Sequence, residues 1–426
     1  MSHDTPAEPP EPPAKRHDDQ PHDVEQTLLV TISGNDRPGV TSTLFDAIAD
    51  VGAEVRDLEQ VVVRDHLTLA MLLAAGPQTA RLEQVVHEVG HSLGMKVKVR
   101  HGTGDSGRRR TGRVAVTVLG NPLHASAVSA VTARIAGHGA NIDRIRRLSR
   151  YPVTTVEFDV SGAEVDRLRR ELALEAVIQG VDIAVSASGL ARRGRRLVVM
   201  DVDSTLIRQE VIEMLAAHAG REAEVRAVTE RAMGGELDFS ESLRERVKAL
   251  AGLDESVLRE VREAVVLTPG ARTLVRTLKR LGFTVALVSG GFIEIVGPIA
   301  QELHIDRAEA NRLEIINGRL TGNVLGDIVD RAGKARALIR FAAEAGLPLS
   351  RTVAIGDGAN DLDMLGVAGL GVAFNAKPVV REQADTAVNV PYLDSVLYLL
   401  GISREEIEEA DALDGTPTPA PALPPR

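Results

Sequence analysis

Hydrophobic and polar positions in the front half of the chain follow one pattern that occurs twice. Residues 27–100 read as a strand, a helix, two strands, a helix and a strand, which is the order of a ferredoxin-like fold. Residues 113–186 repeat this order, with Gly120-Asn121 in the place that Gly34-Asn35 holds in the first copy. We therefore predict two consecutive α+β domains, at residues 26–101 and 112–187.

The pattern changes at about residue 196, where apolar runs begin to alternate with long helical stretches. This alternation is typical of a mostly parallel, Rossmann-like α/β sheet, which we predict for residues 196–402. A helical insert at about 208–266 is too long for a simple crossover and is predicted to form a lid, or helical cap. The predicted strands are 196–203, 284–291, 352–360 and 369–374, and the predicted helices between them are 271–281, 292–302, 334–345 and 361–366.

Composition places the chain among globular proteins with disordered ends. Of its 426 residues, 44% are hydrophobic and 26% are charged, and the length suggests two to four domains. Both ends, residues 1–25 and 403–426, are rich in proline and polar residues and are predicted to be disordered. No apolar run approaches the roughly 20 residues that span a bilayer, and the N-terminus has no signal-like core, so we expect a cytoplasmic protein that does not bind membranes.

Charge and residue usage exclude several other functions. The net charge of −10 and an aromatic content of 2% argue against nucleic-acid binding. The absence of cysteine excludes disulfides and thiolate chemistry. Two basic clusters, at 108–110 and 192–196, are interpreted as solvated linker charge.

Polar residues stand at the ends of three predicted strands: Asp201, Ser289 and Asp357. Ligands of open α/β sheets bind outside the carboxyl ends of the strands, so we expect these side chains to lie close together. Lys334 opens a predicted helix of the same domain. Each residue alone could cap a turn, but the set of four indicates a catalytic site.

The motifs DVDST (201–205), SGG (289–291) and GDGAND (356–361), together with Lys334, resemble those of the haloacid dehalogenase-like phosphatase superfamily. The resemblance implies that Asp201 is a nucleophile that forms a phospho-aspartate. Asp203 would then be the general acid and afterwards the base. It also implies one Mg²⁺, held by the side chains of Asp201 and Asp357 and the backbone carbonyl of Asp203.

The same resemblance assigns phosphate binding to Ser289, Gly290 and Lys334. Asp361 would support the water shell of the metal, although it could equally be the N-cap of the helix that follows.

Longer stretches look like the phosphoserine phosphatase family: DVDSTLIRQEVIEMLA, MGGELDFSESLRERV, LVSGGF and GDGANDLDML. This likeness implies that Glu210 binds an ammonium group and Arg246 a carboxylate. Asn360 would also contact substrate, and Met233 and Phe239 would cover the site. Arg246 could instead be an ordinary exposed helix charge, and Met233 and Phe239 could simply be lid core.

The leading hypothesis is a Mg²⁺-dependent phosphatase that converts O-phospho-L-serine to L-serine, the last step of serine biosynthesis. One alternative is a related phosphatase for another small ester, such as phosphohomoserine or a sugar phosphate. Glu210 and Arg246 argue against a sugar, which would leave both charges unpaired. Another alternative is a non-catalytic amino-acid sensor.

The two front copies resemble ACT domains, which sense amino acids in biosynthetic enzymes. The turn GNDRPG (34–39) carries this resemblance, and Asn35, Asp36 and Gly39 are the candidate residues for an amino-acid effector, expected to be L-serine. Asp36 could instead cap the helix that follows. The second copy reads GNPLHA and lacks the Asp and the Arg-Pro-Gly. Open sheet edges in these domains predict a homodimer or homotetramer.

Overall fold

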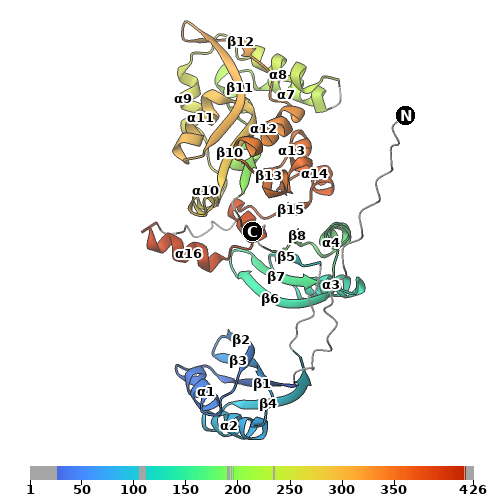
Figure 1. Ribbon diagram of the computed structural model, residues 1–426. Coiled ribbons are helices and arrows are strands. Elements are labelled where there is room, and N and C mark those ends of the chain that lie inside the picture. Colours follow the sequence, from blue (N-terminus) through green and yellow to red (C-terminus); the bar gives the residue numbers. More distant parts are fainter. Residues whose placement is uncertain are drawn as a thin grey trace, which may run out of the picture. The chain divides into compact units, whose positions relative to one another are not determined.

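The computed structural model describes residues 26–104, 112–189, 192, 194, 196–233, 236–416 and 418. The chain divides into two compact units, Met1–Arg109 and Arg110–Arg426. The first unit holds one α+β domain, and the second unit holds another α+β domain and the α/β domain (Figure 1). Among the described residues, no helix has both the length and the apolar character needed to cross a bilayer.

The first α+β domain has the predicted ferredoxin-like order. Its antiparallel sheet runs β2-β3-β1-β4. Alternate residues of β3, such as Leu69 and Met71, are buried, whereas the edge strand β2 is exposed along its whole length. The elements are β1 (Gln26–Asn35), α1 (Val40–Ala49), β2 (Val55–Val63), β3 (His66–Ala74), α2 (Thr79–Ser92) and β4 (Lys96–Thr103).

The second α+β domain repeats this order and packs against the α/β domain. Val116 and Val118 of its strand β5 pack with its own helices, whereas Leu119 belongs to the core of the α/β domain. Asn389 of the α/β domain donates two hydrogen bonds to Asp182, from its backbone N–H at 2.7 Å and its side-chain amide at 2.6 Å. The sheet runs β6-β7-β5-β8, and the elements are β5 (Val114–Gly120), α3 (Ala125–Gly137), β6 (Asn141–Ser149), β7 (Thr154–Ser161), α4 (Val165–Gln179) and β8 (Asp182–Ala187).

The α/β domain is built on a seven-stranded sheet of order β12-β11-β10-β9-β13-β14-β15, parallel except for β12. Val198 and Met200 of β9 pack on one face, and Leu197 and Val199 pack on the other, so both faces are buried. The strands are β9 (Leu197–Met200), β10 (Thr284–Phe292), β11 (Arg307–Ile316), β12 (Arg319–Leu325), β13 (Thr352–Gly356), β14 (Leu370–Phe374) and β15 (Thr386–Val388).

Helices cover both faces of this sheet (Figure 1). Helices α10 (Ala271–Arg280) and α11 (Ile293–Glu302) contribute to the same core as Val198 and Met200. Helices α12 (Arg331–Glu344) and α13 (Leu362–Val367), with α14 (Pro378–Gln383), contribute to the core on the Leu197 face. The fold class predicted from the sequence is therefore confirmed.

The predicted lid region, 208–266, is helical. It contains α6 (Val211–Ala219), α7 (Glu222–Met233), α8 (Phe239–Lys248) and α9 (Ser256–Ala264). Its first and last residues are tied together, because the Arg208 N–H donates to the Val266 carbonyl at 2.9 Å. The insert thus begins and ends at one place, next to the loop that follows β9.

The structure corrects the prediction that residues 403–426 are disordered. A further helix, α16 (Arg404–Leu413), begins with a capping box in which Ser403 and Glu406 exchange hydrogen bonds. Asp411 of this helix is fully buried and pairs with Arg276 and Arg280 of α10. Residues 1–25 and 419–426 lie outside the described residues.

The interpretation of residues 192–196 as solvated charge is also wrong for the arginines that the structure describes. Arg192 and Arg196 are each 8% exposed. Arg192 pairs with Glu157 of β7 and donates to the carbonyl of Leu399 in α15 (Val396–Leu399). This contact joins the second α+β domain to the α/β domain. The other basic cluster, 108–110, lies outside the described residues.

Candidate active site

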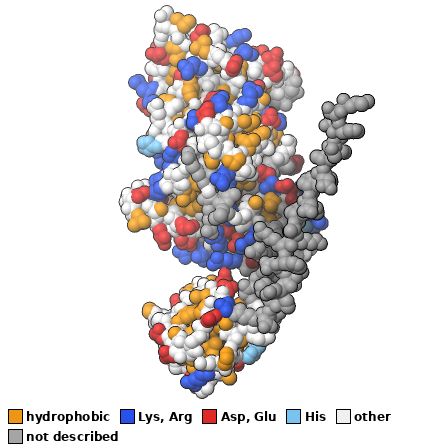
Figure 2. Space-filling model, viewed as in Figure 1, with side chains coloured by type: hydrophobic (Ala, Val, Ile, Leu, Met, Phe, Trp, Pro, Cys, Tyr) orange, Lys and Arg blue, Asp and Glu red, His pale blue; other side chains and the backbone are white. Residues whose placement is uncertain are grey.

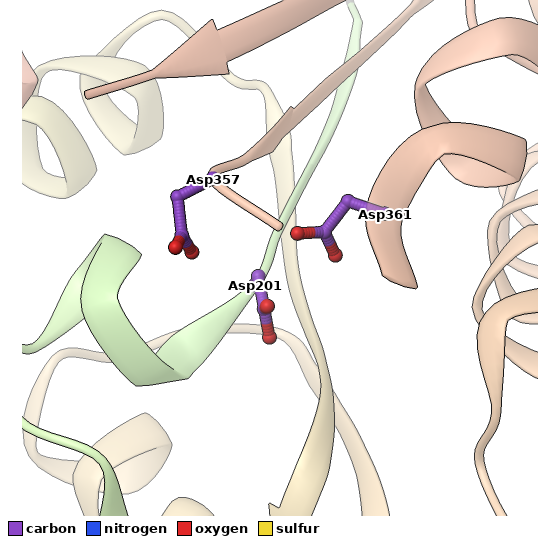
Figure 3. A group of neighbouring side chains, drawn as sticks. All are labelled: Asp201, Asp357 and Asp361. Carbon is purple, nitrogen blue, oxygen red and sulfur yellow. The ribbon is translucent and has the colours of Figure 1, made fainter. Parts of the chain in front are cut away.

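Three aspartates meet at the carboxyl ends of β9 and β13. Asp201 follows β9, Asp357 follows β13, and Asp361 ends the short helix η3 (Ala359–Asp361). The Asp201 N–H donates to the Ile355 carbonyl at 2.9 Å, which extends the pairing of the two strands to the aspartate itself. One carboxylate oxygen from each aspartate lies within 4.8 Å of the other two, and Figure 3 shows the three side chains converging.

A glycine makes room for the third aspartate. A Cβ atom at Gly356 would lie 2.4 Å from Cγ of Asp361, so only glycine allows this carboxylate to approach the strand. Asp361 Oδ2 accepts a hydrogen bond from the Gly358 N–H at 3.0 Å. Asp361 does occupy the N-cap position of α13, but its side chain makes no capping hydrogen bond to this helix.

Lys334 brings positive charge to these carboxylates from α12, whose N-cap is Asp330. The lysine is fully buried, and its Nζ lies 2.7 Å from both Asp201 Oδ2 and Asp361 Oδ1. Burial alone would lower the pKa of Lys334, but the two carboxylates raise it above its ordinary value. Burial, together with Asp361, holds the pKa of Asp201 well above its usual range.

These residues fit a divalent cation. Three carboxylates and a single ammonium leave excess negative charge in a mostly buried site, which is costly without further positive charge. Mg²⁺ prefers oxygen ligands of this kind and keeps several of its waters. Burial raises the pKa of Asp357 to about 6, and a bound cation would favour its ionised form instead.

Asp203 lies in the loop η1 (Val202–Leu206), between Asp201 and the start of the lid. Its Oδ1 accepts from the Val211 N–H at 2.9 Å, and its Oδ2 lies 3.4 Å from the Ser289 hydroxyl, which donates to it. Burial and then the charge of Glu210 raise the pKa of Asp203 to about 7. A Cβ at Gly291 would lie 2.9 Å from Asp203 Oδ2, so the second glycine of SGG is needed for this approach.

The lid places two of the predicted residues near the aspartates. Phe239 begins α8, and its Cζ would lie 3.1 Å from a Cβ built at Gly290, so the ring lies against the SGG loop. Arg246 lies further along α8, and its Nε donates to the Ser242 carbonyl at 3.3 Å.

The charges of three carboxylates act on Arg246. Burial lowers its pKa, while Glu210, Asp203 and Glu213 act in the opposite direction. Within the part of the chain that the structure describes, no carboxylate lies close enough to Arg246 to form an ion pair. Its guanidinium is therefore available to an anionic ligand.

Asn360 and Met233 are the two other residues that were predicted to lie at the substrate site. Asn360 lies within GDGAND, and its Oδ1 would be 2.1 Å from a Cβ at Gly358. Met233 ends α7, but its side chain lies outside the described residues.

Sequence reasoning did not assign roles to two side chains that support the site. Thr205 donates from its hydroxyl to Asp357 Oδ1 at 3.0 Å, and its place in the DVDST motif is a signal that could have identified it. Asn311 is buried in β11 and donates to the Gly290 carbonyl at 2.8 Å. Asn311 was missed because β11, the strand that carries it, was not predicted.

The first α+β domain contains a separate cavity of about 400 Å³ beside the GNDRPG turn. Asn35 lines this cavity, but Asp36 and Gly39 do not. The N-cap of α1 is Gly39, and no side chain caps this helix, so Asp36 does not act as its cap. The lining residues are Ser33, Gly34, Asn35, Arg37, His66, Leu93, Gly94 and Lys96.

A hollow in the second α+β domain has a different chemical character. It measures about 510 Å³ and is lined by small, hydroxyl and aliphatic residues and one amide, without any lysine or arginine: Ser129, Thr132, Ala133, Ile135, Ala136, Ala140, Asn141 and Ile142. The two copies therefore differ in the charge of their cavities.

Family models match three segments of the chain, and two relatives match 91% of it. Residues 26–100 and 113–186 each match an ACT domain, and residues 198–366 match a haloacid dehalogenase-like hydrolase. The phosphoserine phosphatase of Streptomyces coelicolor is 61% identical, over 91% of this chain and 95% of its own length. That of Mycobacterium tuberculosis is 51% identical, over 91% of this chain and 96% of its own.

Solved structures agree with these matches. A probable phosphoserine phosphatase from Vibrio cholerae is 34% identical, covers 69% of this chain and 88% of its own, and has a TM-score of 0.54. A haloacid dehalogenase family hydrolase from Salmonella enterica serovar Typhi is 27% identical, covers 67% and 98%, and has a TM-score of 0.58. With two ACT domains ahead of its hydrolase domain, this chain belongs to the phosphoserine phosphatase family of haloacid dehalogenase-like hydrolases.

Proposed function

We propose that this protein hydrolyses O-phospho-L-serine to L-serine and phosphate, as the last step of L-serine biosynthesis in the cytoplasm. The observation that carries this proposal is the pair of opposite charges beside the aspartates. Arg246 is mostly buried without an ion-pair partner among the described residues, and Glu210 lies close enough to influence the pKa of Asp203. An amino acid carries one carboxylate and one ammonium, which match these two side chains.

Asp201 is the nucleophile in this proposal. A carboxylate and a phosphate charge 4 Å apart repel by about 4 kcal/mol at an effective dielectric constant near 20, so the attack requires nearby cations. Lys334 supplies one, since its ammonium lies 2.7 Å from Asp201 Oδ2. The side chains of Asp201 and Asp357, with the Asp203 carbonyl, would hold Mg²⁺, supported by Asp361. When bound, this ion would neutralise phosphate charge.

Asp203 acts as the acid and then the base. Its pKa of about 7 allows it to carry a proton at neutral pH, donate it to the leaving serine oxygen, and then accept a proton from the attacking water. The hydroxyl of Ser289, which already points at Asp203, and the N–H of Gly290 would bind phosphate oxygens. Met233 and Phe239 would cover the substrate, and Asn360 would contact it.

Phosphate release from four esters tests this function. We expect Mg²⁺-dependent release that is fastest with L-phosphoserine. Relative to L-phosphoserine, kcat/KM should be roughly tenfold or more lower for phosphohomoserine, which is one methylene longer. It should be lower still for glucose 6-phosphate and O-phosphoethanolamine. A chelator should abolish release, and added Mg²⁺ should restore it. Faster release from phosphohomoserine or the sugar would favour the related-phosphatase alternative, and no release from any ester would favour a non-catalytic sensor.

We further propose that the cavity of the first ACT domain binds an amino-acid effector, L-serine, which inhibits the enzyme. Arg37 and Lys96 line this cavity and suit a carboxylate, and Asn35 offers an amide. The hollow of the second ACT domain has no such cation. Feedback of this kind requires a ligand site distinct from the catalytic one, and this cavity meets that condition.

Replacing Lys96 with alanine is expected to raise the serine concentration for half-inhibition by roughly three- to tenfold, because one charge-assisted contact to the carboxylate is lost. Turnover without serine should not change. Lys98→Ala is the matched control, since Lys98 is exposed on the same strand and does not line the cavity. Equal serine sensitivity in the two variants would contradict this assignment.

Association of copies through the front half is also part of the proposal, as a homodimer or homotetramer. The edge strand β2 exposes Val61, Val62 and Val63 by 56%, 41% and 65%. Figure 2 shows hydrophobic side chains on the visible surface of the first domain. An unpaired apolar edge of this kind is a ready template for pairing with another chain.

A further inference from the structure

Ser204 adopts a backbone conformation that is unusual for its residue type. It lies in the catalytic loop between Asp203 and Thr205, with φ of 55° and ψ of 0°. This left-handed region is unfavourable for residues with a Cβ atom and persists only where the surroundings hold it.

The conformation directs both the side chain and the backbone of Ser204 toward the start of the lid. Its hydroxyl donates to Glu210 Oε1 at 2.7 Å, and its N–H donates to the Gln209 carbonyl at 3.3 Å. Gln209 in turn accepts at its side-chain oxygen from the Val266 N–H at 3.0 Å, where the lid ends. Ser204 thus connects the catalytic loop to both ends of the lid.

Glu210 needs such a restraint. Its side chain is exposed, and its charge is felt by the carboxylates of Asp203 and Asp357. Like charges repel, and a long exposed side chain gains rotamer entropy by turning into solvent. A hydrogen bond from Ser204 opposes both effects and leaves Glu210 Oε2 available to another donor.

We propose that Ser204 is a positioning residue that holds Glu210 in place for the ammonium group of the substrate. This inference rests on the proposed function and extends it to a residue outside the catalytic set. In this proposal Ser204 acts through Glu210, to which its hydroxyl donates, and not on the reacting atoms. Its contribution is therefore to the recognition of the amino group, not to the chemical step.

The test uses the full-length protein and three esters. L-Phosphoserine and O-phosphoethanolamine carry an ammonium group, whereas the L-enantiomer of 3-phosphoglycerate has a hydroxyl in its place. For Ser204→Ala, we expect kcat/KM to fall roughly three- to tenfold on the two ammonium esters, mainly through KM. On L-3-phosphoglycerate it should change less than twofold, because no ammonium is present to be bound.

Ser204→Gly separates the hydroxyl from the backbone. Glycine adopts the left-handed conformation freely but lacks the hydroxyl, so it should show the same selective loss as alanine. An equal loss on all three esters, or wild-type selectivity in Ser204→Gly, would overturn the inference. If the wild-type protein does not prefer L-phosphoserine at all, the proposed function fails instead, so the two failures are distinguishable.

Discussion

Asp201→Asn is expected to lower kcat on L-phosphoserine by about 10⁴-fold or more, because an amide oxygen cannot serve as the nucleophile. Removing a nucleophile from a catalytic set that works as a unit typically has effects of this size. The folded state should not suffer. Asn is nearly isosteric with Asp, and its side-chain oxygen can keep the hydrogen bond that Asp201 Oδ1 accepts from the Val202 N–H at 2.7 Å. Lys334 keeps Asp361 as its partner at 2.7 Å.

Asp363→Asn is the matched control for this variant. Asp363 lies on α13, two residues after Asp361, and pairs with Arg331 at the surface, where the two side chains are 40% and 50% exposed. Phosphate release should stay within twofold of the wild type. Measurable turnover by Asp201→Asn above about one percent of the wild-type rate would show that another residue can attack phosphorus.

Glu157→Ala is expected to lower the free energy of unfolding by about 3–5 kcal/mol. Glu157 is fully buried between two arginines, and its Oε1 lies 2.6 Å from Arg146. Burial would raise the pKa of Glu157, but Arg192 and Arg146 hold it below its usual value. Without this carboxylate, the guanidinium of Arg192 remains buried with only the Leu399 carbonyl as a partner among the described residues.

The measurement is thermal unfolding of the full-length protein. The Tm of the transition that unfolds the second ACT domain and the hydrolase domain should be roughly 10 °C lower than in the wild type. Arg147→Ala is the control, because the Arg147–Glu405 pair also joins these two domains but is about half exposed, and such pairs contribute less than about 1 kcal/mol. Similar shifts for both variants would contradict the view that the buried pair stabilises this junction.

The placement of the aspartates could be predicted because it depends on local pattern. The apolar run before Asp201 forms a buried strand, so Asp201 lies at the carboxyl end of that strand. The same argument places Asp357 at the carboxyl end of its own strand. Their meeting within 4.8 Å requires only that β9 and β13 are neighbours. Arg192 could not be placed in this way, because its burial depends on Glu157, 35 residues earlier in the chain and on another domain.

Two features were missed although the sequence contains their signals. The hairpin of β11 and β12 turns at Asn317-Gly318, both with positive φ, and Asn-Gly between apolar runs is a strong hairpin signal. The helix α16 begins at Ser403 with Glu406 three residues later, which is the pattern of a capping box. Residues 403–426 were nevertheless predicted to be disordered, because this segment is rich in acidic residues and proline.

The most direct test of the central claim is to trap the covalent intermediate. The full-length protein is incubated with ³²P-labelled L-phosphoserine and Mg²⁺, quenched in acid and digested, and the labelled peptide is identified. We expect label on the peptide that contains Asp201, and none in Asp201→Asn. Label on any other residue, or rapid phosphate release without label on the protein, would contradict nucleophilic attack by Asp201.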